Sequence, residues 1–366
     1  MKLIILGTVP DELLNLKSDL IKAIIKKNCD VIASSSPLIA NSKIDISSLD
    51  FIYEPIHLER HGFSLIGNIR TIISLLNLYK KYKPQYILAF GIKLVIWGGI
   101  SARIRNASFY AYITGLGYAF QGKSLPRKFL TKLVSFLYKI ALKKSKAVIF
   151  ENKDNRDFFV SKKIIPISQT YIINGSGVNM DKYNFTSIPE TPISFLLVSR
   201  LLGEKGLREY AGAAQIVKKE YPDVEFELVG PEDASLDAIS IEEVLGWSDY
   251  INYNGGTDDV RPFIKNCHIY VLPSYHEGLP RSTLEAMSMG RPVLTTNAVG
   301  CKETVDEGLN GFMVPVGSIR KLADKMIWFI ENKDKIQLMG QNSRAIVEKR
   351  FDVHKVNNEI LKILGI

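Results

Sequence analysis

Residues 266–296 read NCHIYVLPSYHEGLPRSTLEAMSMGRPVLTT. The apolar run Ile269–Leu272 predicts a buried strand, and a loop with Pro and Gly follows it. A helix is expected over Ser282–Met289 and a second strand over Pro292–Thr295. Strand, crossover helix and strand in this order predict two parallel strands with the helix packed on the sheet.

The same alternation runs through almost the whole chain and restarts once. In the first half, strands are expected at 3–6, 31–33, 86–90, 109–113 and 147–150, with helices near 11–27, 66–81, 94–104 and 127–144. In the second half, strands are expected at 193–198, 225–229 and 251–253, with helices at 206–220, 260–266 and 319–332. The fold class is therefore α/β, with two Rossmann-like, doubly wound parallel-sheet lobes that face a cleft. We expect an N-terminal domain over 1–185, a second domain over 186–345, and a C-terminal helix within 346–366 that packs back toward the first lobe.

Composition narrows the class of protein. A length of 366 residues favours two domains, and 46% hydrophobic with 23% charged residues excludes disorder, collagen and coiled coil. The longest apolar stretch, 86–101, contains Lys93 and is shorter than the roughly 20 residues of a spanning helix. The first residues predict a strand rather than a signal peptide, because Pro10, Asp11 and Glu12 end the apolar run. Three isolated cysteines without a CxxC pair imply neither disulfides nor a zinc site, so we expect a cytosolic enzyme or binding protein.

Charge is distributed unevenly along the chain. Residues 1–183 contain 27 Lys and Arg against 12 Asp and Glu, and the remainder contains 20 against 26. The window His61–Phe150 holds 15 basic residues and no acidic one. Such a basic half is suited to nucleic acid, an anionic membrane or a phosphorylated substrate.

The loop and helix at 273–287 predict an anion site. A helix that begins near Ser282 presents free N–H groups and the positive end of its dipole at the carboxyl end of the preceding strand. Glu277 on the loop and Glu285 in the helix flank this site, and carboxylates there are suited to accept hydrogen bonds from sugar hydroxyls. The alternative is that Glu277 is a solvated loop residue and Glu285 stabilises the helix dipole.

These motifs resemble the retaining, nucleotide-sugar-dependent glycosyltransferases of family four, which have the GT-B fold. The resemblance rests on Glu277-x7-Glu285, on Ser199-Arg-Leu-Leu-Gly-Glu-Lys-Gly206, and on the order of the flanking segments 174–179, 266–274, 290–293, 300–305 and 310–311. It covers the C-terminal lobe and, more thinly, the N-terminal lobe.

The resemblance implies a role for each matching residue. Glu285 would bind the ribose, and Glu277 with the amides of Gly278 and Leu279 would bind the donor sugar. Arg200 and Lys205 would hold the diphosphate, which agrees with their place after the first strand of the second lobe, where a phosphate leaving group needs fixed positive charge. The alternative for Lys205 is a solvated residue at a helix start.

No metal or other cofactor is expected. The sequence has no Asp-x-Asp triplet, the motif with which glycosyltransferases of the other large fold hold a divalent cation, and its five histidines lack metal-ligand spacing. The Arg200 and Lys205 pair therefore favours metal-independent transfer.

The N-terminal lobe departs from the family at 111–120. Thr114 stands where many members carry a His, and the Gly115-Leu-Gly117 variant is similar to enzymes that extend undecaprenyl-diphosphate-linked glycans, such as bacterial N-acetylgalactosaminyltransferases. Thr114, Gly115 and Gly117 are thus candidates for the acceptor side, since glycine permits close backbone approach to a ligand. A plain turn is the alternative.

A basic stripe is expected on the helix near 127–144. Lys128, Lys132, Ser135, Lys139, Lys143 and Lys146 recur at helical spacing, which is typical of a membrane-facing or partner-binding helix. The alternative is a solvated face, but the window without acidic residues favours an anionic membrane surface. Whether Phe129 and Phe136 insert into the membrane or pack into the lobe stays open.

We therefore expect a retaining glycosyltransferase at the cytoplasmic face of the membrane, peripheral to it. It would move a hexose or N-acetylhexosamine from a nucleotide sugar, expected to be UDP-linked, to a polyprenyl-diphosphate-linked sugar. Nucleic acid is disfavoured because no RRM, KH or zinc pattern appears. A GT-B nucleotide-sugar 2-epimerase and a non-catalytic GT-B partner subunit are the alternatives.

Overall fold

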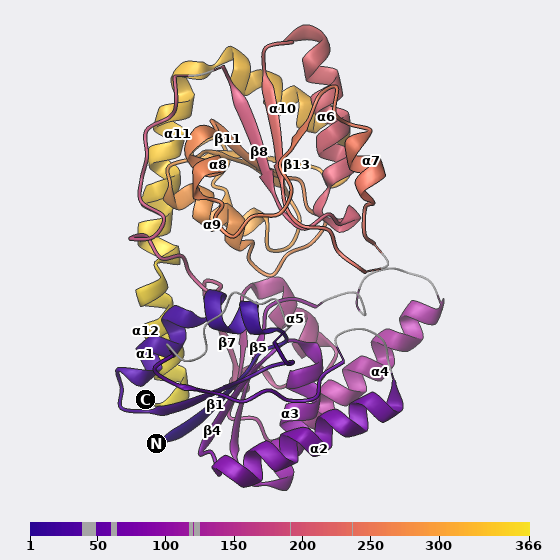
Figure 1. Ribbon diagram of the computed structural model, residues 1–366, viewed down its shortest axis with the longest axis vertical. Helices are drawn as coiled ribbons and strands as arrows, with labels where there is room; N and C mark the ends of the chain where they lie inside the picture. Colours follow the sequence, from indigo (N-terminus) through magenta and orange to yellow (C-terminus); the bar gives the residue numbers. More distant parts are fainter. Residues whose placement is uncertain (39–48, 60–63, 117–119, 121–124, 191, 236) are drawn as a thin grey trace. The chain divides into compact units, whose positions relative to one another are not determined.

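A computed structural model describes residues 1–38, 49–59, 64–116, 120, 125–190, 192–235 and 237–366 (Figure 1). The chain forms two compact units, one of Met1–Ser176 with Val356–Ile366 and one of Gly177–Lys355. The division lies between Ser176 and Gly177 rather than between 185 and 186, and the second unit extends to Lys355 rather than to 345.

The described part of the first unit forms a seven-stranded parallel sheet in the order β3-β2-β1-β4-β5-β6-β7. The strands are β1 (Lys2–Leu6), β2 (Asp30–Ser34), β3 (Ile52–Tyr53), β4 (Tyr86–Phe90), β5 (Ser108–Ile113), β6 (Ala147–Phe150) and β7 (Thr170–Ile172). Both faces of the central strands are buried, which explains why they appear in the sequence as continuous apolar runs.

Helices cover both faces of this first sheet. The helices α2 (Leu65–Tyr82), α3 (Ile92–Ile104), α4 (Leu125–Leu142) and α5 (Lys153–Ser161) pack on one face. The other face is covered by α1 (Ser18–Ile25), which follows a π-helical turn at Glu12–Leu16, and by α12 (Val353–Leu364). Val356 and Ile360 of α12 belong to the same buried cluster as Leu20 and Ile21 of α1, so the end of the chain is part of the core of the first unit.

The described part of the second unit forms a six-stranded parallel sheet in the order β10-β9-β8-β11-β12-β13. The strands are β8 (Ser194–Val198), β9 (Glu225–Val229), β10 (Asn252–Tyr253), β11 (Ile269–Leu272), β12 (Val293–Thr296) and β13 (Gly311–Val314). The helices are α6 (Leu207–Glu220), α7 (Ile241–Leu245), α8 (Arg261–Asn266), α9 (Arg281–Ser288), α10 (Ile319–Glu331) and α11 (Lys333–Ile346). The apolar faces of α6 and α10 pack on one side of the sheet, and those of α8 and α9 pack on the other.

A fully buried arginine fixes the start of the second unit to its core. Arg291 donates hydrogen bonds to the carbonyl oxygens of Ile264 and Lys265 in α8 and to Thr186 and Ser187 in the segment before β8. Burial lowers its pKa, and this set of acceptors compensates for the loss of hydration.

The elements expected from the longer apolar patterns are present within two to three residues of their expected ends, apart from the helix expected at 11–27, which is interrupted by the π-helical turn. The short strands β3, β7 and β13 and the helices α5, α7 and α11 were not expected. The described helices include none that is long and apolar enough to cross a bilayer.

Candidate active site

The carboxyl ends of β8 and β11 lie side by side, because these two strands are paired in the sheet. After β8 the chain makes a 3-10 turn at Gly203–Lys205 and enters α6 through Gly206, whose φ is 75°. A Cβ atom at Gly206 would lie 2.1 Å from the carbonyl oxygen of Pro273, which follows β11. Glycine at this position therefore brings the loop that carries Lys205 against the loop that carries Glu277.

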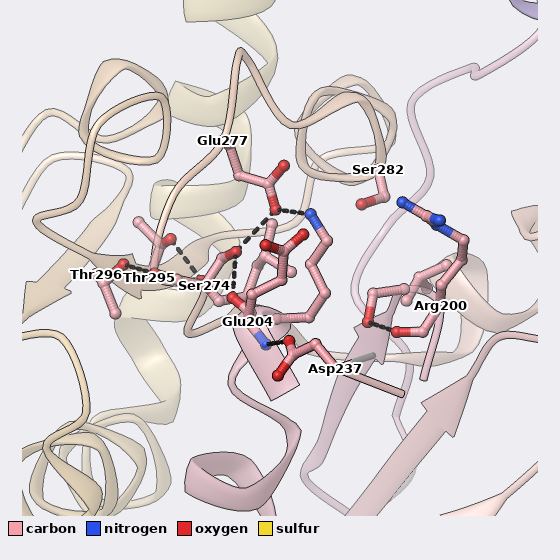
Figure 2. A network of polar contacts seen from close by, with 12 residues as sticks. Arg200, Glu204, Asp237, Ser274, Glu277, Ser282, Thr295 and Thr296 are labelled. Carbon is pink, nitrogen blue, oxygen red and sulfur yellow. Dashed lines mark hydrogen bonds and ion pairs between the residues drawn. The ribbon is translucent and has the colours of Figure 1, made fainter. Parts of the chain in front are cut away.

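Lys205 and Glu277 form an ion pair at this edge. The Nζ atom of Lys205 lies 2.7 Å from Oε1 of Glu277, and each side chain is only 14% exposed. Ser274 donates its hydroxyl to the same Oε1 atom, at 2.8 Å. The two residues predicted to hold the diphosphate and the donor sugar are thus brought together, and the Ser274 hydroxyl helps to orient the carboxylate (Figure 2).

Arg200 reaches the same edge from the end of β8 and is half exposed, at 54%. Its Nη1 atom lies 2.5 Å from Oδ2 of Asp233, which in turn accepts a hydrogen bond from the backbone of Ser235. Burial alone would raise the pKa of Asp233, but the hydrogen bonds of Ser235 and the Arg200 charge lower it, so this carboxylate is ionised beside the guanidinium. In Figure 2 the Arg200 side chain extends toward Ser282 at the start of α9.

Asp233, Asp237 and Ser274 complete the site and were missed from the sequence. Asp237 accepts a hydrogen bond from the backbone amide of Glu204 at 2.6 Å, which fixes the turn that presents Lys205. Ser274 lies next to the strand end and only three residues before Glu277, a spacing that could have indicated it. Asp233 and Asp237 belong to a loop without regular structure, and no pattern in the sequence places them beside residues 200–205.

Glu285 lies within α9 and is buried. Its Oε1 atom accepts a hydrogen bond from Arg281, one turn earlier in the helix, at 3.0 Å. Tyr183 hydrogen-bonds to the same carboxylate, and burial together with this negative charge raises the pKa of the phenol. The Glu285 carboxylate is therefore fixed by its ion pair with Arg281 rather than freely solvated, and its role toward a ribose stays a prediction.

The loop between Glu277 and α9 is shaped by a second glycine contact. The amide of Glu277 donates to the carbonyl oxygen of Val299 at 2.9 Å. Gly300 has a φ of 84°, and a Cβ atom there would lie 2.3 Å from the carbonyl oxygen of Glu277. Gly278 and Leu279 follow in this closely packed loop, and the use of their amides for a donor sugar stays a prediction.

The acceptor-side candidates lie in the first unit. Thr114 and Gly115 line a small pocket at the carboxyl ends of β4 and β5, together with Gly91, Ile92, Tyr112, Ile113 and Tyr138. Gly117 lies outside the described residues. The described side chains of His, Cys, Asp and Glu form no group of three with the arrangement of metal ligands.

The basic stripe is shorter than expected. The helix α4 ends at Leu142, so Lys128, Lys132 and Lys139 lie on the helix, whereas Lys143 follows its end and Lys146 lies in the turn before β6. All five lysines are exposed.

Family models account for both units. Residues 181–346 match the model described as "Glycosyl transferases group 1", and residues 9–152 match the model described as "Glycosyl transferase 4-like". Both models describe glycosyl transferases, and together they span most of the chain, which is therefore a glycosyltransferase. It is an α/β protein of the GT-B fold, with one parallel-sheet unit for each model.

Two curated relatives align with this glycosyltransferase over most of their length. A Campylobacter jejuni protein named N,N'-diacetylbacillosaminyl-diphospho-undecaprenol alpha-1,3-N-acetylgalactosaminyltransferase is 26% identical, over 75% of this chain and 73% of the relative. An Escherichia coli protein named UDP-Gal:alpha-D-GlcNAc-diphosphoundecaprenol alpha-1,3-galactosyltransferase is 24% identical, over 80% of this chain and 78% of the relative.

Solved structures share the fold at lower identity. Sucrose-phosphate synthase from Thermosynechococcus elongatus has a TM-score of 0.83 at 17% identity and covers 100% of this chain and 98% of its own. Anabaena HepE in complex with UDP-glucose has a TM-score of 0.80 at 20% identity and covers 100% of this chain and 99% of its own.

Proposed function

We propose that this glycosyltransferase moves a hexose or N-acetylhexosamine from a UDP-linked sugar to a sugar carried on polyprenyl diphosphate, with retention of configuration. The observation that carries the proposal is the cluster of Arg200, Lys205 and Glu277 at one sheet edge. The two curated relatives support the acceptor class, because both are named for undecaprenyl-diphosphate-linked substrates. The assembly of a bacterial surface polysaccharide or glycan, such as O-antigen, is the pathway class that uses such acceptors.

The donor would be held entirely by the second unit. Arg200 and Lys205 would bind the diphosphate, Glu285 the ribose, and Glu277 with the amides of Gly278 and Leu279 the sugar. The Lys205 and Glu277 pair supports these roles, because a diphosphate that binds Lys205 frees one Glu277 oxygen to accept a bond from a sugar hydroxyl. Two fixed cations would stabilise the leaving diphosphate, and the transfer would require neither a metal nor another cofactor.

The reaction would proceed by front-face attack. The bond between the anomeric carbon and the diphosphate oxygen breaks, and the acceptor hydroxyl oxygen forms a bond to the same face of that carbon. The proton of the hydroxyl passes to the departing phosphate oxygen. Arg200 and Lys205 would lower the barrier by holding the negative charge that develops on this phosphate.

The acceptor would enter from the first unit and from the membrane. The pocket beside Thr114 and Gly115 is suited to the acceptor sugar, and Thr114 offers a hydroxyl where many family members offer an imidazole. Lys128, Lys132, Lys139 and Lys143 are exposed, and each basic group near anionic lipid contributes about 1 kcal/mol of attraction. We place the enzyme peripherally on the inner, cytoplasmic face of the cell membrane.

A two-step assay tests this function. Purified protein is incubated with UDP- and other nucleotide-linked sugars, first alone and then with a polyprenyl-diphosphate-linked acceptor, and products are identified by mass spectrometry and NMR. We expect slow donor hydrolysis alone and an α-linked product from an α-linked donor when the acceptor is present. Conversion of a free nucleotide sugar to its 2-epimer would instead indicate an epimerase, and the absence of any turnover would indicate a non-catalytic subunit.

A further inference from the structure

The outer surface of α4 carries two adjoining stripes. Lys128, Lys132 and Lys139 form one, and Phe129 and Phe136 lie next to it on the same exposed side of the helix. Phe129 is 72% exposed and Phe136 is 60% exposed, so these rings do not pack into the first unit. The helix is anchored by its opposite face, through Val134 and Tyr138, which are buried.

A second apolar face lies on α2 and was not expected from the sequence. Leu65 and Ile66 are 79% and 66% exposed, and Ile69 and Ile73 continue the same face at helical spacing. The buried face of this helix is formed by other residues, among them Leu75 and Leu78. Four large aliphatic side chains on one exposed helix face are unusual for a surface that only contacts water.

The two helices belong to one layer. Both pack against α3, through the hydrogen bond of Trp97 to Asn68 of α2 and the bond of Arg103 to the carbonyl oxygen of Ile140 in α4. They cover the same face of the first sheet (Figure 1), and each begins at the carboxyl edge of that sheet, as helices between parallel strands do. Tyr138 of α4 also lines the pocket that contains Thr114.

We propose that Leu65, Ile66, Ile69, Ile73, Phe129 and Phe136, here called the apolar ridge, insert among the acyl chains of an anionic bilayer. The flanking lysines would lie at the lipid headgroups. The inference deepens the proposed function, on whose lipid-linked acceptor it rests, by naming a membrane anchor that is hydrophobic as well as electrostatic.

The charge of the surface around the apolar ridge favours an anionic bilayer over a second copy of the chain. The window from His61 to Phe150 holds basic residues and no acidic ones, so a second copy of this surface would place like charges face to face. Two carboxylates of the adjoining segment lie near α2: Glu54 is paired with Lys81 at the far end of the helix, and Glu59 lies against Gly67 in its first turn and faces His57. An anionic bilayer meets both requirements: its apolar interior accommodates the apolar ridge, and its negatively charged headgroups attract the lysines.

Liposome binding, measured at low salt and at 1 M NaCl, tests the apolar ridge. One variant carries Ile66→Gln, Ile69→Gln and Phe136→Gln, and its matched control carries Leu245→Gln, Leu309→Gln and Leu338→Gln, three comparably exposed residues of the second unit. Vesicles contain phosphatidylglycerol and phosphatidylcholine. At 1 M NaCl, where the Debye length is about 3 Å, we expect the wild type and the control to stay bound and the ridge variant to lose at least tenfold in partitioning.

Three further measurements make the result decisive. A tryptophan placed by Ile69→Trp should be quenched by lipids brominated on their acyl chains. The wild type should be monomeric in light scattering without lipid, and the ridge variant should keep the donor hydrolysis of the wild type. Equal binding of ridge variant and control, complete release of the wild type by salt, or a dimer that the ridge substitutions dissociate would overturn the inference, whereas a failure of the proposed function would appear only in the donor and acceptor assays.

Discussion

The carboxyl edges of the two sheets carry different kinds of side chain. In the second unit, Lys205, Glu277 and Arg200 with their partners form a network of ion pairs and hydrogen bonds. In the first unit, the pocket beside Thr114 is lined by glycine, aliphatic and aromatic residues, and the nearest helix layer exposes the apolar ridge. In the proposed function, the edge of the second sheet would bind the diphosphate, and the edge of the first sheet would bind the lipid-linked acceptor mainly by its shape and its lipid.

The proposed reaction would account for this difference, because its two halves have different requirements. A leaving diphosphate gains charge in the transition state, and stabilising it demands fixed cations whose geometry is set in advance. The pairs Lys205–Glu277 and Arg200–Asp233 keep those cations in place before a ligand binds. An acceptor hydroxyl carries little charge, and its half of the site needs position more than electrostatics.

The largest effect is expected at the carboxyl edge of the second sheet, which carries Arg200 and Lys205. Arg200→Ala or Lys205→Ala should lower turnover about a hundredfold or more, because each change removes a preorganised charge from the leaving group. The matched controls Arg320→Ala and Lys321→Ala, which remove exposed charges that pair with Asp324, should leave turnover unchanged.

Chelation tests the same proposal in another way. Initial rates measured with excess EDTA should equal those without it. Loss of activity with EDTA that Mg²⁺ or Mn²⁺ restores would contradict cation stabilisation by Arg200 and Lys205 alone.

The next largest effect distinguishes the roles proposed for Glu285 and Glu277. Glu285→Ala should weaken binding of UDP roughly tenfold to a hundredfold, the scale of a lost hydrogen bond to a charged group. Glu277→Ala should spare UDP binding or strengthen it, because Lys205 loses its competing partner, and should depress sugar transfer. Calorimetry with UDP alone measures both, and an equal loss of affinity in the two variants would show that the roles are assigned wrongly.

The contrast between the edges also explains what the sequence could predict. Arg200 and Lys205 follow the apolar strand β8, Glu277 follows the apolar strand β11, and Glu285 lies in the helix after β11. Their common edge therefore follows from the order of elements. Asp233 and Asp237 come from an irregular loop, and their contacts with Arg200 and Glu204 depend on tertiary packing. Short elements such as β3 and β7 have too few residues for a periodic pattern.

The apolar ridge shows a different limit. In the sequence, the aliphatic residues 65, 66, 69 and 73 resemble the buried face of an ordinary amphipathic helix. Only the structure shows that α2 buries other positions, such as Leu75 and Tyr79, and leaves these four exposed. Which of two apolar stripes faces the core is decided by the neighbouring helices and not by the period of the pattern.

A smaller effect is expected at the carboxyl edge of the first sheet, where the pocket beside Thr114 lies. Thr114→Leu fills part of the pocket, and we expect the KM for the lipid-linked acceptor to rise roughly tenfold with little change in donor hydrolysis. The conservative Thr114→Ser variant keeps the hydroxyl and should behave like the wild type. If Thr114→Leu instead raised the KM for the donor and left that for the acceptor unchanged, the assignment of the two edges would be reversed.

The last expected effect concerns stability rather than activity, in the response of the two units to mild acid. Burial lowers the pKa of His268 to about 4, and its Nδ1 atom accepts a hydrogen bond from the backbone of Ser194 at 3.2 Å, which requires the neutral ring. The unfolded chain binds this proton near pH 6.5, so the stability that neutral His268 contributes is complete above pH 6.5 and is lost as the pH falls toward 4. The loss should be about 0.8 kcal/mol at pH 6 and about 2 kcal/mol at pH 5.

The tryptophans allow this loss to be assigned to one unit. Trp247 and Trp328 lie in the second unit and Trp97 lies in the first. In urea titrations at pH 7.5 and pH 5, a protein that keeps only Trp328 should show a lower unfolding midpoint in acid, and His268→Gln should reduce that difference. His354→Gln, which alters an exposed histidine of the same unit, is the matched control and should not. An acid response that is unchanged in His268→Gln would mean that carboxylates with lowered pKa, such as Asp233 and Glu243, carry the acid sensitivity of the second unit instead.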